Sequence, residues 1–226
     1  MCEVCCKANL DLIRTGLVTL SWGNASVVNR NAGVVAIKPS GFDYHALQPR
    51  DIVIVSLETG EVLEGALKPS SDTPTHLHLY RSFPDLGAIV HTHSNYAVAW
   101  AQAELEIPCL GTTHADHFKG PVPLTRQFRD NETVTDYELN TGKIIVERFD
   151  EGIDPSDFPG VLVAGHGPFT WGGSLQQAVE NAIALEAIAK MAYHTQVLNS
   201  GANLLPDHVL GKHFNRKWGP DAYYGQ

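Results

Sequence analysis

Four short runs rich in β-branched residues crowd the first third of the chain, and no other feature limits its fold so strongly. They are Ala25–Asn29, Val34–Ile37, Asp51–Val55 and Glu61–Leu63. Turn-forming residues separate them, notably at positions 31–33 and 58–60. Strands joined by such short connections pair in antiparallel fashion. The pattern therefore predicts a strand meander.

Helical and strand-like segments alternate along the rest of the chain. Helices are expected over Glu3–Arg14, Thr73–Tyr80 and Asn95–Ala103, and buried strands over Ala88–Thr92 and Gly160–Ala164. Apolar residues recur at helical spacing from Ser174 to about Leu198, which predicts the longest helix, with Ser174 as its N-cap.

This order of elements favours an α+β or three-layer αβα fold, with a central, mainly antiparallel sheet flanked by helices. No linker or repeat divides the sequence, so residues 1–226 are expected to form a single domain. No G-x-G-x-x-G motif follows a strand, which argues against a nicotinamide cofactor.

Charge and hydropathy narrow the classes of partner. The chain has 16 Lys and Arg against 25 Asp and Glu, a formal charge of −9, and no basic run. We therefore expect no nucleic-acid partner, although a small anion remains possible. No stretch has the roughly 18 apolar residues of a membrane helix, and the start lacks a signal-peptide core. These features predict a cytoplasmic protein with no membrane partner.

The cysteines are concentrated at the N-terminus, at Cys2, Cys5 and Cys6, with Cys109 further along. Cys2-x-x-Cys5 resembles half of a metal or redox site, but a second pair at zinc-finger spacing is missing. Reduced thiols on a terminal helix are the simpler interpretation.

Two histidines give the strongest chemical signal. His91 and His93 are two residues apart at the end of a predicted strand, so their side chains project from the same face. Two adjacent imidazoles can bind a metal, or they can be hydrogen-bonded structural residues. His166, between two glycines after another apolar strand, is a possible third ligand.

Asp72 precedes a predicted helix and is either its N-cap or an oxygen ligand. Together with the three histidines it would form a set that suits Zn²⁺. Spacing alone leaves open whether the four residues converge. His114 and His117 are alternative ligands, and Asp116 between them is either a solvated loop residue or a general base.

Three loops have the composition of an anion pocket. They are Trp22-Gly-Asn24, Lys38-Pro-Ser-Gly41 and Ser70-Ser71. Each is a turn by its residue types, yet each can offer free backbone N–H groups, and Lys38 adds a cation. His213 lies ahead of a tyrosine-rich tail that is either frayed or completes the site of a neighbouring subunit.

Seven motifs, taken in order, carry a family resemblance that extends from about Leu17 to the last residue. They are Thr19-Leu-Ser-Trp-Gly-Asn24, Ile37-Lys-Pro-Ser-Gly41, Lys68-Pro-Ser-Ser-Asp-Thr-Pro-Thr75, Ile89-Val-His-Thr-His-Ser94, Gly111-Thr-Thr-His-Ala-Asp116, Gly165-His-Gly-Pro168 and Ala222-Tyr-Tyr-Gly-Gln226. Each motif is weak alone, but the ordered set resembles the L-ribulose-5-phosphate 4-epimerases of the class II aldolase and epimerase family. The cysteine-rich N-terminus departs from that pattern.

The resemblance implies a role for each matched residue. Around a divalent metal, zinc or alternatively Mn²⁺ or Co²⁺, it places Asp72, His91, His93 and His166. Around the substrate it places Gly23, Asn24, Lys38, Ser40, Gly41, Ser70, Ser71, Thr112 and His213. It also implies a homotetramer with sites between subunits, in which Asp116 and the Tyr224 of a neighbouring subunit are the acid/base pair.

The implied reaction is a retro-aldol epimerisation of L-ribulose 5-phosphate to D-xylulose 5-phosphate, by cleavage and re-formation of the C3–C4 bond. It needs neither NAD nor PLP. The nearest alternative is an aldolase such as L-fuculose-phosphate aldolase, which usually has Glu where this chain has Asp72. A non-catalytic, adducin-like scaffold is expected to lose metal histidines that this chain keeps.

Overall fold

A seven-stranded sheet forms the centre of the molecule. The computed structural model describes residues 1–224, so Gly225 and Gln226, which end the last of the seven motifs, lie outside the described residues. The strands are β1 (Gly23–Asn29), β2 (Val34–Ile37), β3 (Val53–Ser56), β4 (Val62–Glu64), β5 (Ala88–Thr92), β6 (Gly160–Val163) and β7 (Gly167–Gly172), in the spatial order β4-β3-β2-β1-β5-β7-β6. All neighbouring pairs are antiparallel, which confirms the predicted fold class.

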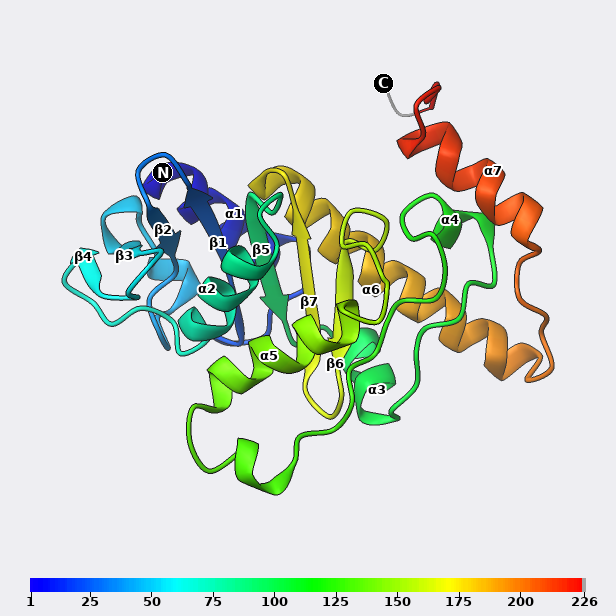
Figure 1. Cartoon of the computed structure of the whole chain (residues 1–226), viewed down its shortest axis with the longest axis horizontal. Helices are drawn as coiled ribbons and strands as arrows, with labels where there is room; N and C mark the ends of the chain where they lie inside the picture. The colour runs from blue at the N-terminus through cyan, green and yellow to red at the C-terminus, as the bar shows by residue number, and fades with distance from the viewer. Residues whose placement is uncertain (225–226) are drawn as a thin grey trace.

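Helices cover both faces of this sheet and extend beyond one end of it (Figure 1). They are α1 (Cys2–Arg14), α2 (Thr73–Ser82), α3 (Asn95–Gln102), α4 (Thr112–Ala115), α5 (Tyr137–Phe149), α6 (Leu175–Leu198) and α7 (Asp207–Trp218). Helices α2 and α5 lie in front of the sheet in Figure 1, and α1 and α6 lie behind it. The arrangement is the predicted three-layer one.

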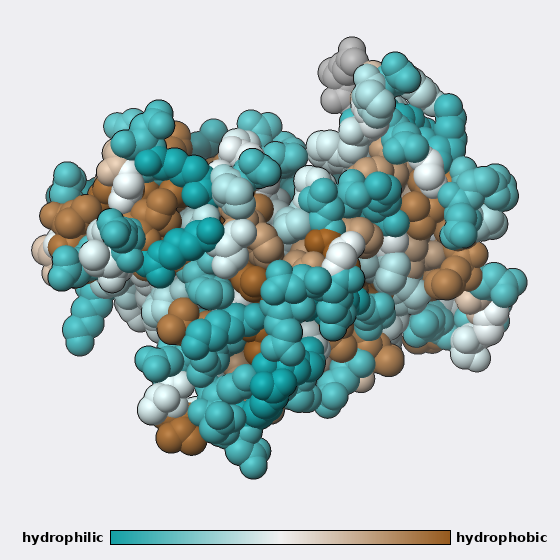
Figure 2. Space-filling view, viewed as in Figure 1, coloured by the Kyte–Doolittle hydropathy of each residue, from teal (hydrophilic) through white to brown (hydrophobic). Residues whose placement is uncertain are grey.

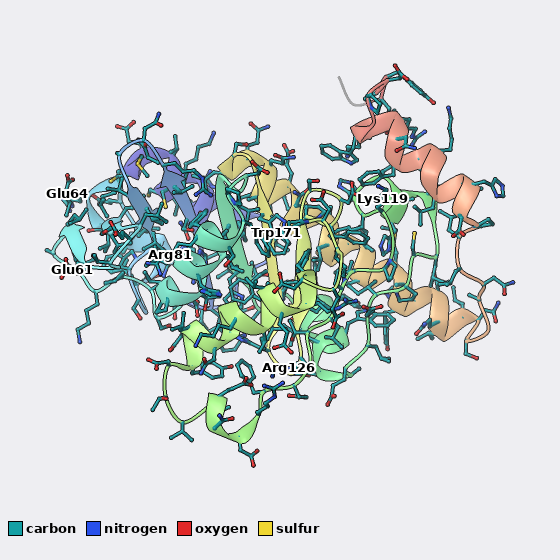
Figure 3. The ribbon with its side chains drawn as sticks, viewed as in Figure 1. Glu61, Glu64, Arg81, Lys119, Arg126 and Trp171 are labelled. Carbon is teal, nitrogen blue, oxygen red and sulfur yellow. The ribbon has the colours of Figure 1, made fainter. Side chains whose placement is uncertain are left out.

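Strand alternation decides which residues meet which helices. Ala25, Ala88 and Val90 point into the core formed with α1 and the start of α6. Ile89 points the opposite way, into the core formed with α2 and α5. That second core includes Trp171, labelled in Figure 3, which packs against Phe83 and Phe149. Since side chains alternate along a strand, His91 shares the α2 and α5 face with Ile89.

Most predicted elements are present within a residue or two of their expected bounds. Ser174 is the N-cap of α6, and its Oγ accepts a hydrogen bond from the Gln177 N–H at 3.2 Å, as predicted. The third strand begins later than expected because Pro49–Asp51 form a 3-10 turn. Strand β7 and helices α4, α5 and α7 were not predicted.

Helices α4 and α7 pack together at the end of the molecule opposite β4 (Figure 1). Figure 2 shows apolar surface among the hydrophilic residues of this region, where Leu204, Leu210 and Phe214 line a groove beside α7. Within residues 1–224, no helix combines the length and the apolarity needed to cross a lipid bilayer.

Candidate metal and substrate site

His91 is fixed by its neighbours on the adjacent strand. Its ring stacks on Phe169 of β7, with 4.2 Å between centroids, and Nδ1 lies 2.9 Å from the carbonyl oxygen of Pro168. An Nδ1–H that donates to this carbonyl leaves Nε2 with a free lone pair. Nε2 lies 3.0 Å from Nε2 of His93, so both rings present a nitrogen at the same point.

His93 follows β5 directly, and the start of helix α3 secures its position. The backbone N–H groups of Tyr96 and Ala97 each donate to the carboxylate of Glu186 on α6 at 2.9 Å. A carboxylate at a helix N-terminus satisfies N–H groups that have no partner within the helix. The loop that carries His93 is therefore anchored at both ends.

His166 reaches the same point from the tight turn between β6 and β7. Gly165 adopts a φ of +69°, and a Cβ on Gly167 would lie 2.9 Å from the carbonyl oxygen of Thr92. Gly165 thus permits the left-handed backbone of the turn, and Gly167 permits the close approach of the turn to β5. The His166 ring lies 4.8 Å from that of His91 and 5.0 Å from that of His93, between centroids.

The three imidazoles fit a divalent metal. One nitrogen from each of His91, His93 and His166 lies within 4.8 Å of the other two. Burial, together with the neighbouring imidazoles, lowers the pKa of His91 and of His166 to about 3, so the rings are neutral ligands at physiological pH. Nδ1 of His166 is buried, and no described residue hydrogen-bonds to it. Neutral nitrogens converging in this way suit Zn²⁺ and similar ions.

Asp72 lies in the same cavity but outside the three-histidine cluster. It occupies the N-cap position of α2 without making a capping hydrogen bond. Its Oδ2 instead accepts a hydrogen bond from Asn24 Nδ2 at 2.6 Å, and the same amide donates to Ser70 Oγ at 2.9 Å. Of the two alternatives for Asp72, the structure thus rejects side-chain capping and leaves the carboxylate facing the cavity.

A cavity of about 330 Å³ brings together the histidines and all three predicted anion loops. It is lined by Ser21, Trp22, Gly23, Asn24, Lys38, Pro39, Ser40, Gly41, Ser70, Ser71, Asp72, His91, His93, Tyr137, Glu138 and His166. Gly23 has a φ of +106°, and a Cβ there would lie 2.5 Å from the His91 carbonyl oxygen, so only glycine fits. The expectation of free N–H groups is wrong for Ser40 and Ser70, whose N–H groups donate to the carbonyls of Lys68 and Lys38.

Lys38 is the cation of this cavity, and it is almost fully buried, with 1% of its surface exposed. Its Nζ donates to the Pro39 carbonyl oxygen at 3.2 Å and lies 4.4 Å from the ring centroid of Tyr44. Burial lowers the pKa of Lys38 to about 8, with Asp43 acting weakly in the opposite direction. The ammonium has one carbonyl partner here, which leaves it able to donate to an anion.

Sequence reasoning missed Tyr137 and Glu138, which line the cavity from the start of α5. The Tyr137 ring stacks on Phe128 and lies 6.2 Å from the ring of His166. Burial raises the pKa of the Tyr137 phenol, and the Asp72 carboxylate adds to the effect. Their segment carries no recognisable motif, so only the fold reveals that they belong to the site.

Asp116, His213 and Tyr224 do not line this cavity; they form a second cluster between α4 and α7. Asp116 accepts hydrogen bonds from Arg216 at 2.9 to 3.2 Å and lies 3.0 Å from Nδ1 of His213. Burial alone would raise the pKa of Asp116, but the hydrogen bonds from Arg216 and His213 hold it below its usual value. Thr112 begins α4 nearby and is exposed.

The alternative ligands His114 and His117 do not join the three-histidine cluster either. Nε2 of buried His114 lies 2.8 Å from the Gly120 carbonyl oxygen. Nε2 of His117 lies 3.5 Å from Nζ of Lys217. Both therefore belong to the packing around α4 and α7.

Comparisons with known proteins agree with this geometry. Residues 3–193 match the family described as Class II Aldolase and Adducin N-terminal domain. The chain is 51% identical over 219 residues to L-ribulose-5-phosphate 4-epimerase UlaF of Salmonella paratyphi A and to that of Salmonella typhi, covering 97% of this chain and 95% of each relative. Among solved structures, an L-fuculose 1-phosphate aldolase superposes with a TM-score of 0.79 at 26% identity, covering 94% of this chain and 93% of that one. The aldolase/epimerase/decarboxylase YgbL of Escherichia coli superposes with a TM-score of 0.74 at 27% identity, covering 93% and 96%.

Proposed function

The chain belongs to the class II aldolase and adducin family, and from that premise we propose that it is a metal-dependent L-ribulose-5-phosphate 4-epimerase. The observation that carries the proposal is the cavity in which the three-histidine cluster adjoins the loops at Gly23–Asn24, Lys38–Gly41 and Ser70–Ser71. The relatives at 51% identity, which are named for this activity, support the choice of substrate.

Zinc is the proposed metal, with Mn²⁺ or Co²⁺ as substitutes. His91, His93 and His166 would hold it, with Asp72 beside them. When bound, it supplies the Lewis acidity that stabilises negative charge on substrate oxygens. The histidines suit this task because burial lowers the pKa of each ring, so they bind as neutral ligands and add no charge of their own.

The opposite end of the cavity is the proposed phosphate site. Lys38 supplies the positive charge, and the serines at positions 40, 70 and 71 supply hydroxyl donors from adjacent loops. Asn24 connects the two ends, because its amide donates both to Ser70 and to Asp72. A phosphate held here fixes the sugar chain so that its carbonyl end points toward the histidines.

Inversion at C4 proceeds by bond cleavage. A base removes the proton of the C4 hydroxyl, the C3–C4 bond breaks, and its electron pair moves onto the carbonyl of the three-carbon fragment to give an enediolate. The other fragment is glycolaldehyde phosphate, which turns its opposite aldehyde face before the bond re-forms. One group must accept a proton on one face and a second must donate on the other. We assign Asp116 and Tyr224 to these roles.

These two residues lie outside the cavity of their own chain, which supports a homotetramer with sites between subunits. A ring of subunits related by rotation brings one face of each chain against a different face of the next. In this arrangement α4 and α7 of one subunit would close the cavity of its neighbour with Asp116, His213 and Tyr224. Thr112, at the start of α4, would enter with them.

An aldolase is the second candidate, since an L-fuculose 1-phosphate aldolase has the same fold over nearly the whole chain. The deciding experiment incubates the metal-analysed protein with L-ribulose 5-phosphate and follows the products by NMR. We expect D-xylulose 5-phosphate to form without free aldehyde, and we expect a chelator to abolish this reaction. Accumulation of dihydroxyacetone and glycolaldehyde phosphate would indicate the aldolase instead. No reaction with the metal bound would mean that the substrate is wrong.

A further inference from the structure

Three side chains of helix α7 make polar contacts with Asp116. Arg216 donates to both carboxylate oxygens, through Nη2 at 2.9 and 3.0 Å and through Nε at 3.2 Å. His213 Nδ1 lies 3.0 Å from Oδ1, and the indole N–H of Trp218 donates to the Asp116 backbone carbonyl at 2.7 Å. The Arg216 and Asp116 side chains are only 22% and 14% exposed, so solvent competes little with this ion pair.

The same arginine also holds Tyr224. The guanidinium carbon of Arg216 lies 4.3 Å from the centroid of the Tyr224 ring. The backbone carbonyl oxygen of Arg216 accepts hydrogen bonds from the N–H groups of Tyr223 at 2.8 Å and of Tyr224 at 3.0 Å. The tail after α7 therefore turns back onto the helix, with the Arg216 guanidinium over the face of the Tyr224 ring.

We propose that Arg216 is a positioning residue that holds Asp116 and Tyr224 as one rigid unit. A guanidinium can do this because it is planar: its edge donates to a carboxylate while its face stacks on an aromatic ring. The proposal rests on the proposed function, in which these two residues are the acid/base pair. The pair consequently reaches a neighbouring subunit's cavity already spaced and oriented.

Attachment of α7 does not depend on this arginine. Phe214 is buried beneath the helix, and His213 and Trp218 contact Asp116 independently of Arg216. Removing the guanidinium should therefore release the Tyr224 ring and weaken the hold on the Asp116 carboxylate while the helix stays in place. An Arg216 variant can therefore distinguish a positioning role of the arginine from a structural role.

Arg216 also affects the pKa of Asp116. His213 and Arg216 face Asp116 from α7, Lys217 and His117 lie beside it, and Glu180 faces them from α6. Burial raises the pKa of Asp116, but the hydrogen bonds from Arg216 and His213 outweigh it and keep the carboxylate ionised. Without Arg216 the pKa of Asp116 rises, so the acid limb of the rate profile should move to higher pH.

The test compares Arg216→Ala and Arg216→Lys with wild type in the full-length, metal-loaded protein. Lys212→Gln is the matched control, because Lys212 lies on the same helix as Arg216 and its cation is 5.1 Å from the ring of Tyr223, the residue before Tyr224. We expect Arg216→Ala to lower kcat about 100-fold, as expected for misplaced catalytic groups, with KM and metal content little changed. Added guanidinium should partly restore its rate, and Arg216→Lys should remain impaired because an ammonium lacks the planar face.

Hydrogen exchange supplies a readout independent of turnover. In Arg216→Ala, amides of residues 222–224 should exchange faster while those of α7 remain protected. Full activity in Arg216→Ala or Arg216→Lys, or unchanged exchange in the tail, would overturn the proposal. So would a loss of activity accompanied by loss of α7 protection, because that would make the arginine a helix anchor. Failure of the wild-type protein to epimerise L-ribulose 5-phosphate would refute the proposed function instead, and the exchange result would still decide the role of Arg216.

Discussion

At the scale of single residues, the side chains proposed for metal binding and those proposed for proton transfer lie in different parts of the chain, so their effects should separate on mutation. His91→Asn should deplete the metal and lower activity about 1000-fold, since the metal contributes several kcal/mol to the transition state. Tyr224→Phe should retain the metal and lose about 100-fold or more in kcat, the usual effect of removing an acid/base group. Metal analysis and kinetics on both variants check this, and a Tyr224→Phe enzyme with full activity would remove Tyr224 from the mechanism.

Lys38 predicts a pH dependence of substrate binding. Because its pKa is lowered to about 8, the ammonium loses its proton as the pH rises through 8, and the proposed phosphate site loses its positive charge. KM for L-ribulose 5-phosphate should rise about tenfold or more by pH 9.5, the scale of one charge-assisted hydrogen bond. Lys38→Met should have the high KM at every pH. A wild-type KM that stays constant from pH 7 to 9.5 would contradict the assignment.

At the scale of elements, the cap of α6 should contribute measurable stability. Ser174→Ala removes the oxygen that accepts from the Gln177 N–H, so the free energy of unfolding should fall by about 1 kcal/mol. Urea denaturation measures the change. Ser200→Ala, at an exposed serine beyond the end of the same helix, is the control and should have little effect. Ser174 does not line the cavity that contains the histidines, so turnover at 25 °C should stay unchanged.

The cysteines of α1 act as packing residues on the buried face of that helix. Cys5 is fully buried, with its Sγ near the carbonyl oxygens of Ala25 and Ala36, and Cys6 is 3% exposed. Burial raises the pKa of both thiols, so they remain protonated and unreactive. Replacing Cys2, Cys5 and Cys6 by Ser should leave metal content and kcat intact and lower the unfolding free energy by about 1–3 kcal/mol. Loss of metal in this variant would restore the idea of a cysteine metal site.

Elements with a clear hydrophobic period were predictable from the sequence, and those shaped by tertiary contacts were not. Strand β7 begins Gly167-Pro168, residues that ordinarily mark a turn. Helix α5 contains Gly142 where a Cβ would lie 3.0 Å from the Cβ of His78 on α2, so a helix-weakening residue is needed for close packing. Arg126 (Figure 3) forms ion pairs with Glu132 and with Glu147, and these connect the loop before α5 to that helix. No sequence motif indicates these pairs.

The site was predictable to the extent that it rests on strand geometry. The alternation that places His91 and His93 together follows from a period of two, and the glycines beside His166 indicated a close approach. The spacing could not show that Tyr137 enters the cavity, because that depends on how α5 crosses α2. Nor could it show Arg216 between Asp116 and Tyr224, which are separated by most of the second half of the chain.

At the scale of the whole molecule, the surface of α6 predicts association of subunits. This helix leaves large apolar side chains exposed, among them Ile183, Met191, Tyr193, Val197 and Leu198. Exposed apolar surface of this kind marks contact with another protein. Light scattering should give a particle of four times 24.6 kDa.

Mixing two inactive variants would test whether neighbouring subunits share a site. Subunits with His91→Asn lack the metal but carry Tyr224, whereas Tyr224→Phe subunits have the reverse defect. If each site lies between adjacent subunits of a ring, random assembly of equal amounts gives half of the sites an intact His91 and half of those a neighbour with an intact Tyr224. About a quarter of the sites in co-expressed mixtures would then be complete. Activity should therefore reappear at that level in the hybrids. Hybrids as inactive as their parents would place each site within one chain.

The pairing of β1 with β5 determines which residues of the cavity are neighbours. Asn24 lies opposite His91 in register, and His91 lies opposite Phe169 on β7, so these three residues stand side by side on neighbouring strands. Strands in a sheet keep a spacing of about 4.8 Å that side-chain motion does not alter. The sheet thus fixes the separation between the backbone of His91, a proposed metal ligand, and that of Asn24, whose amide donates to Ser70 at the proposed phosphate site. Because side-chain motion cannot widen this separation, a ketose phosphate with one more carbon should have a higher KM than L-ribulose 5-phosphate, which steady-state kinetics on the two sugars would measure.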